Sequence, residues 1–251
     1  MKKGIIITVT IVILLGLLLP VLDLTNGGID GPQENDLAQL AQELPAGKII
    51  NAPCTLDSPF KKEWPTTMCE SFEGESLMPE SVSDGTILLI QDGAYVIDNR
   101  ISENRPAGGG YTIPIVLGAA NDALISINGE MECLEGDCGW GIFLRSTFEE
   151  INYVFLIDNQ GQFSLTGFGG DGVTSQLGNI QSGVHETISV SEENTISAIM
   201  EGEQMMFFVN NNLLASHRAG SGEDPVFGLV AWGSSGAKAK NLIDDILVRS
   251  Q

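Results

Sequence analysis

Short runs of alternating apolar and polar residues fill the chain from about residue 55 to its end. Clusters of Gly, Asn, Asp and Ser separate these runs at intervals of roughly 8–12 residues, which is typical of all-β domains. Asp92-Gly93 and the run from Asn210 to Asn212 each join two apolar runs and suit the positive φ of a tight hairpin. The pattern predicts an all-β fold, an antiparallel β-sandwich of the jelly-roll type.

The segment 138–165, CGWGIFLRSTFEEINYVFLIDNQGQFSL, predicts three consecutive strands. Residues 159–161 are Asn, Gln and Gly, which favour a turn between the second and third strands. Alternate residues of YVFLI (153–157) lie on opposite faces of a strand, and here both faces are apolar. We therefore expect this strand to be buried on both sides in the middle of the sandwich.

Residues 4–22 are apolar and carry no charge, which is long enough for a helix that crosses a bilayer. Lys2 and Lys3 precede this run and Asp23 follows it, so the rest of the chain is expected outside the cytoplasm. A cleaved signal peptide is the alternative, although its apolar core has roughly 7–15 residues and this run is longer. We predict a transmembrane anchor or signal segment over residues 1–23, and a single-pass protein of the cell membrane.

Residues 24–54 are acidic and rich in Gly, Pro, Asn and Gln, which predicts a flexible stalk before a domain over residues 55–251. The whole chain has 33 Asp and Glu against 12 Lys and Arg, for a net charge of −21. Such a surface repels phosphate backbones and excludes nucleic acid as a partner. A solvated acidic surface is the simplest interpretation of this charge, and binding of cations is the alternative.

Four cysteines occur in a domain that is expected to be exported, which favours two disulfides. Pairing between neighbours, Cys54 with Cys69 and Cys133 with Cys138, is the simplest of the three possible connectivities. Neither pair has the spacing of a zinc ribbon, so we interpret all four as structural.

The order of strands and turns resembles the concanavalin A-like lectin/glucanase superfamily, in particular bacterial laminin-G-like and 3-keto-disaccharide hydrolase-like domains. The matching segments are Gly141 to Arg145, Tyr153 to Ile157, Gly161 to Leu165, Asn194 to Ile199, Phe207 to Asn210, Gly228 to Ala231 and Ile243 to Val248. The resemblance spans residues 56–250 and implies the fold far more than a function.

Glycosidases of the same superfamily (glycoside hydrolase family 16) carry a strand motif E-x-D-x-x-E that supplies two catalytic carboxylates. Glu130, Glu132 and Glu135 have this spacing, with Glu132 in place of Asp. A retaining hydrolase needs two carboxyl groups about 5–5.5 Å apart. Because Cys133 and Cys138 bracket Glu135, a solvated acidic hairpin tip is the favoured interpretation of these residues.

Three further side chains are candidates for ligand binding. Trp140 and Trp232 could each stack on a sugar ring, and the alternative for both is burial at the rim of the sandwich. Arg145 could bind an acidic ligand or a sugar hydroxyl, and the alternative is an ion pair with a nearby carboxylate.

Lectin-like sandwiches often hold Ca²⁺ through loop oxygens, so a structural calcium ion is a possible cofactor. Asp158, Asp171 and Asp224 lie in polar loop segments and are candidate ligands, but their spacing matches no diagnostic calcium motif. The sequence thus favours a membrane-anchored, non-catalytic module that binds a glycan or another cell-surface ligand. A carbohydrate-active hydrolase and a structural or protein–protein interaction domain are the alternatives.

Overall fold

The computed structural model describes residue 60 and residues 62–83, 86–99, 111–146, 153–168, 176–218, 225–234 and 236–251. The predicted membrane span, the predicted stalk and Cys54 lie outside these residues. Every regular element in the described ranges is a β-strand. Accordingly, none of those ranges contains a helix with the length and hydropathy of a membrane span.

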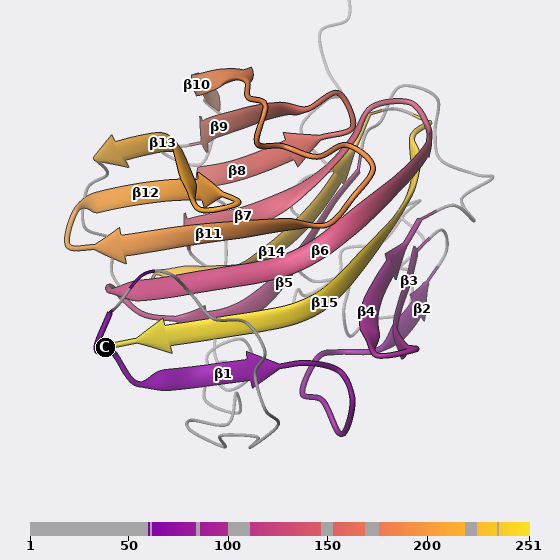
Figure 1. The fold of residues 1–251 in the computed structure, drawn as a ribbon, viewed down its shortest axis with the longest axis horizontal. Coiled ribbons are helices and arrows are strands. Elements are labelled where there is room, and N and C mark those ends of the chain that lie inside the picture. Colours follow the sequence, from indigo (N-terminus) through magenta and orange to yellow (C-terminus); the bar gives the residue numbers. More distant parts are fainter. Residues whose placement is uncertain are drawn as a thin grey trace, which may run out of the picture.

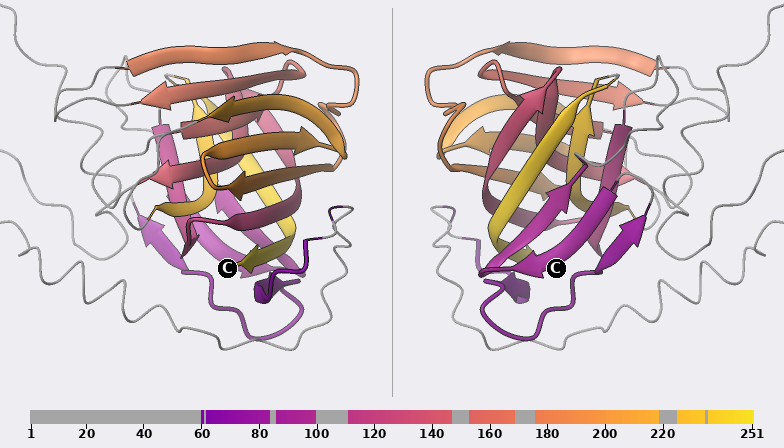
Figure 2. Two further views of the ribbon diagram at one scale, coloured as in Figure 1. Left: turned by 90° about the vertical axis from the view of Figure 1, so that its left-hand side faces the viewer. Right: turned by 90° about the vertical axis from the view of Figure 1, so that its right-hand side faces the viewer.

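Two antiparallel sheets stack face to face, as Figure 1 shows from the front and Figure 2 from both sides. The prediction of an all-β antiparallel sandwich is confirmed. The first and last described strands pair with each other, which brings the start and the end of the sandwich together.

Sheet A is the front layer in Figure 1, and its strand order is β13-β12-β11-β6-β15-β4-β3-β2, with β1 also paired to β15. Its strands are β1 (Thr66–Glu70), β2 (Ser81–Ser83), β3 (Thr86–Gln91), β4 (Ala94–Asp98), β6 (Ala123–Glu135), β11 (Asn194–Glu201), β12 (Gln204–Val209), β13 (Asn212–Arg218) and β15 (Lys238–Ser250). The two longest strands, β6 and β15, run side by side through its centre.

Sheet B lies behind sheet A, and its strand order is β10-β9-β8-β7-β14-β5. Its strands are β5 (Tyr111–Ala119), β7 (Cys138–Ser146), β8 (Tyr153–Asp158), β9 (Gln162–Phe168), β10 (Gln176–Val184) and β14 (Val226–Gly233). Segment 138–165 therefore forms three consecutive strands, as the sequence predicts.

Both predicted hairpin turns are present. Asp92 and Gly93 have φ of 53° and 81° between β3 and β4, and Asn210 and Asn211 have φ of 47° and 68° between β12 and β13. Two consecutive residues with positive φ give the backbone twist that matches a two-residue hairpin. Gly161, with φ of 75°, completes the predicted turn between β8 and β9.

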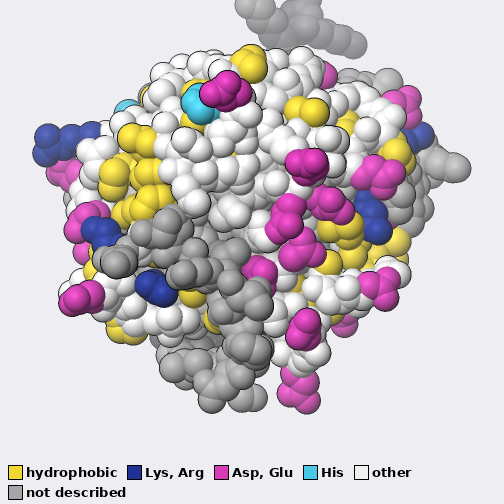
Figure 3. All heavy atoms as spheres, in the orientation of Figure 1, with side chains coloured by type: hydrophobic (Ala, Val, Ile, Leu, Met, Phe, Trp, Pro, Cys, Tyr) yellow, Lys and Arg dark blue, Asp and Glu magenta, His cyan; other side chains and the backbone are white. Residues whose placement is uncertain are grey.

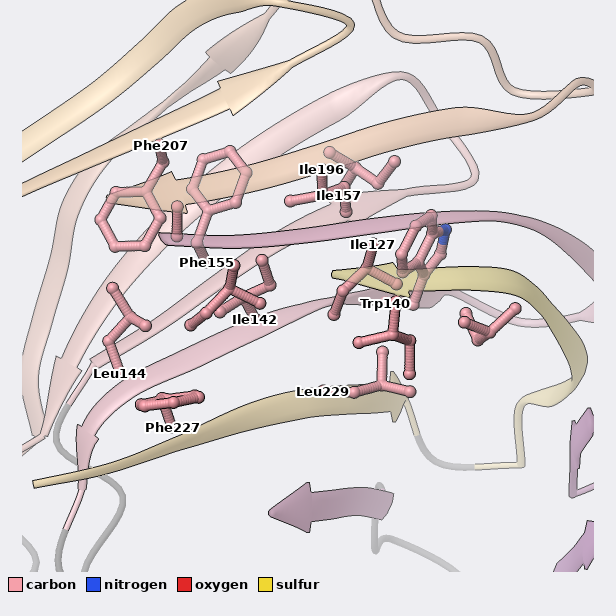
Figure 4. Close-up of a cluster of buried hydrophobic side chains, with 14 of the residues drawn as sticks. Ile127, Trp140, Ile142, Leu144, Phe155, Ile157, Ile196, Phe207, Phe227 and Leu229 are labelled. Carbon is pink, nitrogen blue, oxygen red and sulfur yellow. The ribbon is translucent and has the colours of Figure 1, made fainter. Parts of the chain in front are cut away.

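The main core fills the space between the two sheets, and Figure 4 shows its large side chains. Phe155 of β8 stacks on Phe207 of β12 with ring centroids 4.9 Å apart, which joins sheet B to sheet A. Ile157 faces this core as well, whereas Val154 is buried in a second apolar cluster on the opposite face of β8. The prediction that β8 is buried on both sides is confirmed.

Candidate functional site

The outer face of sheet B carries a row of residues that crosses five strands. Strand register places Trp232 of β14 opposite Gly139 of β7, and Gly139 opposite Asp158 of β8. The backbone N–H of Gln162 donates a hydrogen bond to Asp158, which extends the row onto β9, and Val184 of β10 lies opposite Gln162. Because neighbouring strands are about 4.8 Å apart, the row extends over roughly 19 Å.

Trp232 lies against the backbone of Gly139. A Cβ atom added to Gly139 would be 3.6 Å from Cε3 of the indole, an ordinary van der Waals distance, so the ring lies beside this glycine. Trp232 is partly exposed. An indole that keeps part of its surface in solvent can stack on the apolar face of a sugar ring.

Asp158 is held in a fixed position at the end of β8. Its Oδ1 accepts hydrogen bonds from the backbone N–H groups of Gln160 and Gln162, both at 2.9 Å. The side chain of Gln162 donates in turn to Gln160 Oε1 at 3.1 Å. This turn therefore presents one carboxylate and two amides beside the row that contains Trp232.

Hydroxyl and amide groups follow on β9 and β10. Ser164 and Thr166 share the outer face of β9 with Gln162, and all three are partly exposed. Ser182 lies opposite Ser164, and its Oγ accepts a 2.6 Å hydrogen bond from Asn179 Nδ2. We call Trp232, Asp158, Gln162, Ser164, Thr166, Asn179 and Ser182 the B face.

An apolar cluster forms the centre of the same side of sheet B. Its buried members are Phe143, Val154, Val226 and Val230. Two of the glycines on this side, Gly141 and Gly228, have no room for a Cβ, because one added there would clash with the backbone oxygens of Phe155 and Ile115. Glycine at these positions therefore allows adjacent strands to approach closely.

Three turns meet at the end of the sandwich beside Trp232 and Asp158. Ser234 N donates to Asp137 O at 2.8 Å, and Ser234 Oγ accepts from Asp137 N at 3.0 Å. Asn159 accepts from Cys138 N at 3.2 Å and donates to Gly136 O at 3.2 Å. These bonds join the β6–β7, β8–β9 and β14–β15 connections into one rim.

A disulfide between Cys133 and Cys138 closes the β6–β7 hairpin at this rim, as the sequence predicts. Cys69 is also disulfide-bonded, whereas its predicted partner Cys54 lies outside the described residues. The Cys54–Cys69 pairing therefore stays a prediction.

The outer face of sheet A is acidic, and Figure 3 shows Asp and Glu side chains gathered on it. Glu130 and Glu132 point outward from β6, and Lys240 of β15 lies opposite Glu132. Asp244 sits at a bulge in β15, where burial raises the pKa of its carboxyl to about 6, with Glu193, Glu130 and Asp245 adding repulsion. We call Glu130, Glu132, Glu193, Asp244 and Asp245 the A face.

The structure separates the residues that the sequence singled out. Glu130 and Glu132 lie on the outer face of sheet A, and Glu135 at the end of β6 pairs with Lys238 at 3.1 Å. Trp232 lies on the outer face of the other sheet. Glu130, Glu132 and Glu135 therefore do not line the surface that carries this tryptophan.

Trp140 is a core residue. Its indole is 1% exposed and packs between the sheets, as Figure 4 shows, so it offers no surface to a ligand and the expectation of sugar stacking is corrected. Arg145 belongs to β7, but its side chain lies outside the described part of the chain.

Of the three candidate calcium ligands, Asp158 is described, and Asp171 and Asp224 are not. Asp158 uses Oδ1 to hold the turn after β8. Within the ranges that the structure describes, no group of three or more His, Cys, Asp or Glu is arranged to hold a metal ion.

The polar residues of β9 and β10 were not among the sequence candidates. Gln162, Ser164 and Thr166 alternate with Phe163 and Leu165, and this period of two indicates a strand with one polar face. Asn179 and Ser182 lie beside Thr166 and Ser164 because β10 pairs with β9, and this pairing contains register shifts. No local pattern in the sequence indicates such a pairing.

No protein-family model matches the sequence, and no curated protein matches it. The structure is similar to the laminarinase catalytic domain from Thermotoga maritima MSB8, with a TM-score of 0.53 and 11% identity, covering 76% of this chain and 99% of that chain. The catalytic domain of an endo-1,3-beta-glucanase (laminarinase) from Thermotoga petrophila RKU-1 gives a TM-score of 0.52 and 12% identity, covering 75% and 98%.

The kappa-carrageenase from Pseudoalteromonas carrageenovora, solved with an oligotetrasaccharide of kappa-carrageenan, gives a TM-score of 0.51 and 7% identity, covering 77% of this chain and 98% of that chain. At these identities the likeness concerns the fold alone. The described domain has the concanavalin A-like jelly-roll fold that the sequence resemblance implied.

Proposed function

We propose that this chain is a non-catalytic module that binds a glycan through the B face. The observation that carries the proposal is the position of Trp232, which is partly exposed beside Gly139 on the outer face of sheet B, with Asp158 and Gln162 next in the same row. A sugar ring has an apolar face that suits an indole, and its hydroxyls suit carboxylate, amide and hydroxyl partners.

The A face is a poorer candidate because its side chains are mainly carboxylates. Burial and repulsion from Glu193, Glu130 and Asp245 make the negative charge of Asp244 costly, and none of the described strands of sheet A carries a tryptophan on which a sugar could stack. Aromatic side chains on the outer face of sheet A include Phe208, which is covered by Phe60 at a centroid distance of 4.3 Å.

We further propose that residues 1–23 anchor the chain in the cell membrane and that the domain is extracytoplasmic. The charge order around residues 4–22 and the disulfide between Cys133 and Cys138 support this location. The mass of the mature protein from the producing cell tests the anchor, because loss of residues 1–22 would contradict it.

The binding experiment is a glycan-array screen of the purified chain, followed by calorimetry on each glycan that binds. Trp232→Ala is expected to weaken binding about tenfold or more, since it removes the stacking surface. Phe208→Ala is the matched control, because it removes a partly exposed aromatic ring from the opposite side of the sandwich. Equal binding by wild type and Trp232→Ala would overturn the proposed site.

Repeating the calorimetry in chelator tests the calcium prediction. Loss of binding in chelator, restored by added Ca²⁺, is the result expected if the ion orders a loop of the site.

Hydrolysis is a second candidate because of the neighbouring carboxyls of Asp244 and Glu130. Asp244 has a raised pKa, which is the property of a general acid, and repulsion from Glu130 contributes to that shift. Product analysis of each bound glycan decides between the two functions. Turnover that is abolished by both Asp244→Asn and Glu130→Gln would favour the hydrolase.

A further inference from the structure

We propose that the B face prefers glycans that carry amino groups over neutral glycans, and rejects glycans that carry sulfate, phosphate or uronate groups. The inference rests on the proposed glycan-binding function and names the chemical class of its ligand. It follows from the distribution of charge over the two sides of the sandwich.

The positive side chains that the structure describes all belong to sheet A or to the chain just before it. Lys62 pairs with Glu201 at 2.6 Å, Arg218 with Glu203 at 2.7 Å, and Lys238 with Glu135 at 3.1 Å. The remaining two, Lys240 and Arg249, are on β15. The described side chains of the B face include no cation, and Arg145 on β7 of the same sheet lies outside the described side chains.

The middle strand of the row carries a carboxylate. Asp158 occupies the strand next to Gly139, two strands from Trp232, which is a separation of roughly 10 Å between the two backbones. A glycan that runs along the row from a sugar stacked on Trp232 would bring another sugar of its chain to Asp158. An ammonium group on that sugar can make a charge-assisted hydrogen bond with the carboxylate.

Asp158 is prepared for this contact before any ligand arrives. Two backbone N–H groups hold its Oδ1, so the side chain does not have to be ordered when the ligand binds. Asp137 adds a second carboxylate at the rim, where its Oδ1 accepts a 3.0 Å bond from Gln160 Nε2. Both groups favour a cationic ligand and disfavour an anionic one.

The net charge of −21 acts in the same direction over a longer range. It attracts an oligosaccharide with protonated amines and repels a polyanionic one before contact. Salt screens this long-range contribution, so the preference for amino sugars is expected to shrink as ionic strength rises.

The test compares three oligosaccharides of equal length on the purified full chain by calorimetry. They are a β-1,4-linked glucosamine oligomer at a pH where its amines are protonated, its N-acetylated counterpart, and a uronic acid oligomer. We expect the amino oligomer to bind roughly threefold tighter than the N-acetylated one, the size of an exposed ion pair. The uronic acid oligomer is expected not to bind.

Asp158→Asn is expected to abolish the preference for the amino oligomer, because affinity for that oligomer should fall more than affinity for the N-acetylated one. The amide keeps an Oδ1 that can accept both turn hydrogen bonds. Glu203→Gln is the matched control, since it changes net charge equally at the turn between β11 and β12 of sheet A. Gln162→Lys adds a cation to the same row and is expected to reverse the selectivity.

Binding of the N-acetylated oligomer that depends on Trp232, with no preference for the amino oligomer, would overturn the charge selection and leave the proposed function intact. An equal loss of preference in Asp158→Asn and Glu203→Gln would also overturn it, because the effect would then come from net charge alone. If no oligomer binds at all, both this inference and the glycan-binding proposal fail.

Discussion

The two outer faces of the sandwich share one core and differ in what lies over it. The outer face of sheet A carries mainly carboxylates, and one of them, Asp244, has a pKa raised by burial and by its neighbours. The outer face of sheet B combines glycines, a buried apolar cluster and a row of polar side chains beside Trp232, among which Asp158 carries a charge.

A concentration of acidic side chains therefore does not by itself identify a ligand-binding site in this chain. Crowded carboxylates destabilise one another, and solvation is their simplest role. Glycines that bring strands close together, by contrast, constrain the fold of sheet B.

Gly141→Ala is expected to destabilise the domain most, by about 3 kcal/mol or more. Its Cβ would collide with the backbone oxygen of Phe155 on the adjacent strand, which cannot move without opening sheet B. Urea unfolding measures the loss. Gly74→Ala is the matched control, because an added Cβ there meets no atom within 4 Å. Equal stability of the two variants would show that sheet B does not depend on this close approach.

Replacing both Cys133 and Cys138 with Ser is expected to cost about 2 kcal/mol, since the disulfide closes a short loop. The same change loosens the rim beside Trp232 and Asp158, so glycan affinity is expected to fall as well. Thermal unfolding and calorimetry measure the two effects. A loss of stability without any loss of affinity would show that glycan binding at the B face does not depend on this rim.

Ser126→Ala is expected to destabilise sheet A by about 1 kcal/mol. The buried hydroxyls of Ser126 and Ser197 form a 2.7 Å hydrogen bond, so removing one leaves the other unpaired away from water. The double variant with Ala at both positions should be closer to wild type in urea unfolding than the single variant. A double variant that loses the sum of two single effects would contradict this account.

Asp244→Asn is expected to raise stability at pH 7, by less than about 1 kcal/mol after solvent screening. The pKa of Asp244 in the folded chain is about 6, above its ordinary value of 3.8, so the native state binds more protons between these limits. Wild-type stability therefore falls as pH rises from about 4 to about 6 and stays lower above that range.

The variant should lose this dependence, which urea unfolding at several pH values measures. Glu203→Gln, which changes charge equally beside Arg218, is the matched control and should retain the dependence. A dependence that persists in Asp244→Asn would place its origin elsewhere in the molecule.

Much of the fold could be predicted from the sequence because it depends on local chemistry. Asp92-Gly93 and Asn210-Asn211 are suited to positive φ, so they determine where two hairpins turn. Apolar alternation in the run 153–157 depends only on the geometry of a strand and places β8 correctly between two apolar layers.

The burial of Trp140 and the exposure of Trp232 could not be predicted from the sequence. Trp140 alternates with Ile142 and Leu144, and the three share the core face of β7. Trp232 alternates with Val230, which is itself buried, so both faces of β14 are apolar and the pattern does not separate core from surface. The packing of the two sheets decides between them, because it buries Trp140 in the core and leaves Trp232 partly exposed.

The sequence also does not show on which sheet Glu130, Glu132 and Glu135 lie. The spacing of Glu130, Glu132 and Glu135 matches a known motif, but spacing along one strand says nothing about which sheet that strand joins. The pairing of β6 with β11 and β15 places it in sheet A, away from the tryptophan on sheet B. The cluster around Asp244 likewise depends on a bulge and on a loop residue, Glu193, that is distant in the sequence.

Hydrogen–deuterium exchange of the purified chain, with and without a glycan that it binds, tests most directly whether the glycan binds to the B face. We expect the glycan to slow exchange in β14, β8 and β9, around Trp232, Asp158 and Gln162, and to leave β6 and β15 unchanged. Slower exchange in β6 and β15, with none in β14, would contradict the assignment of binding to the B face.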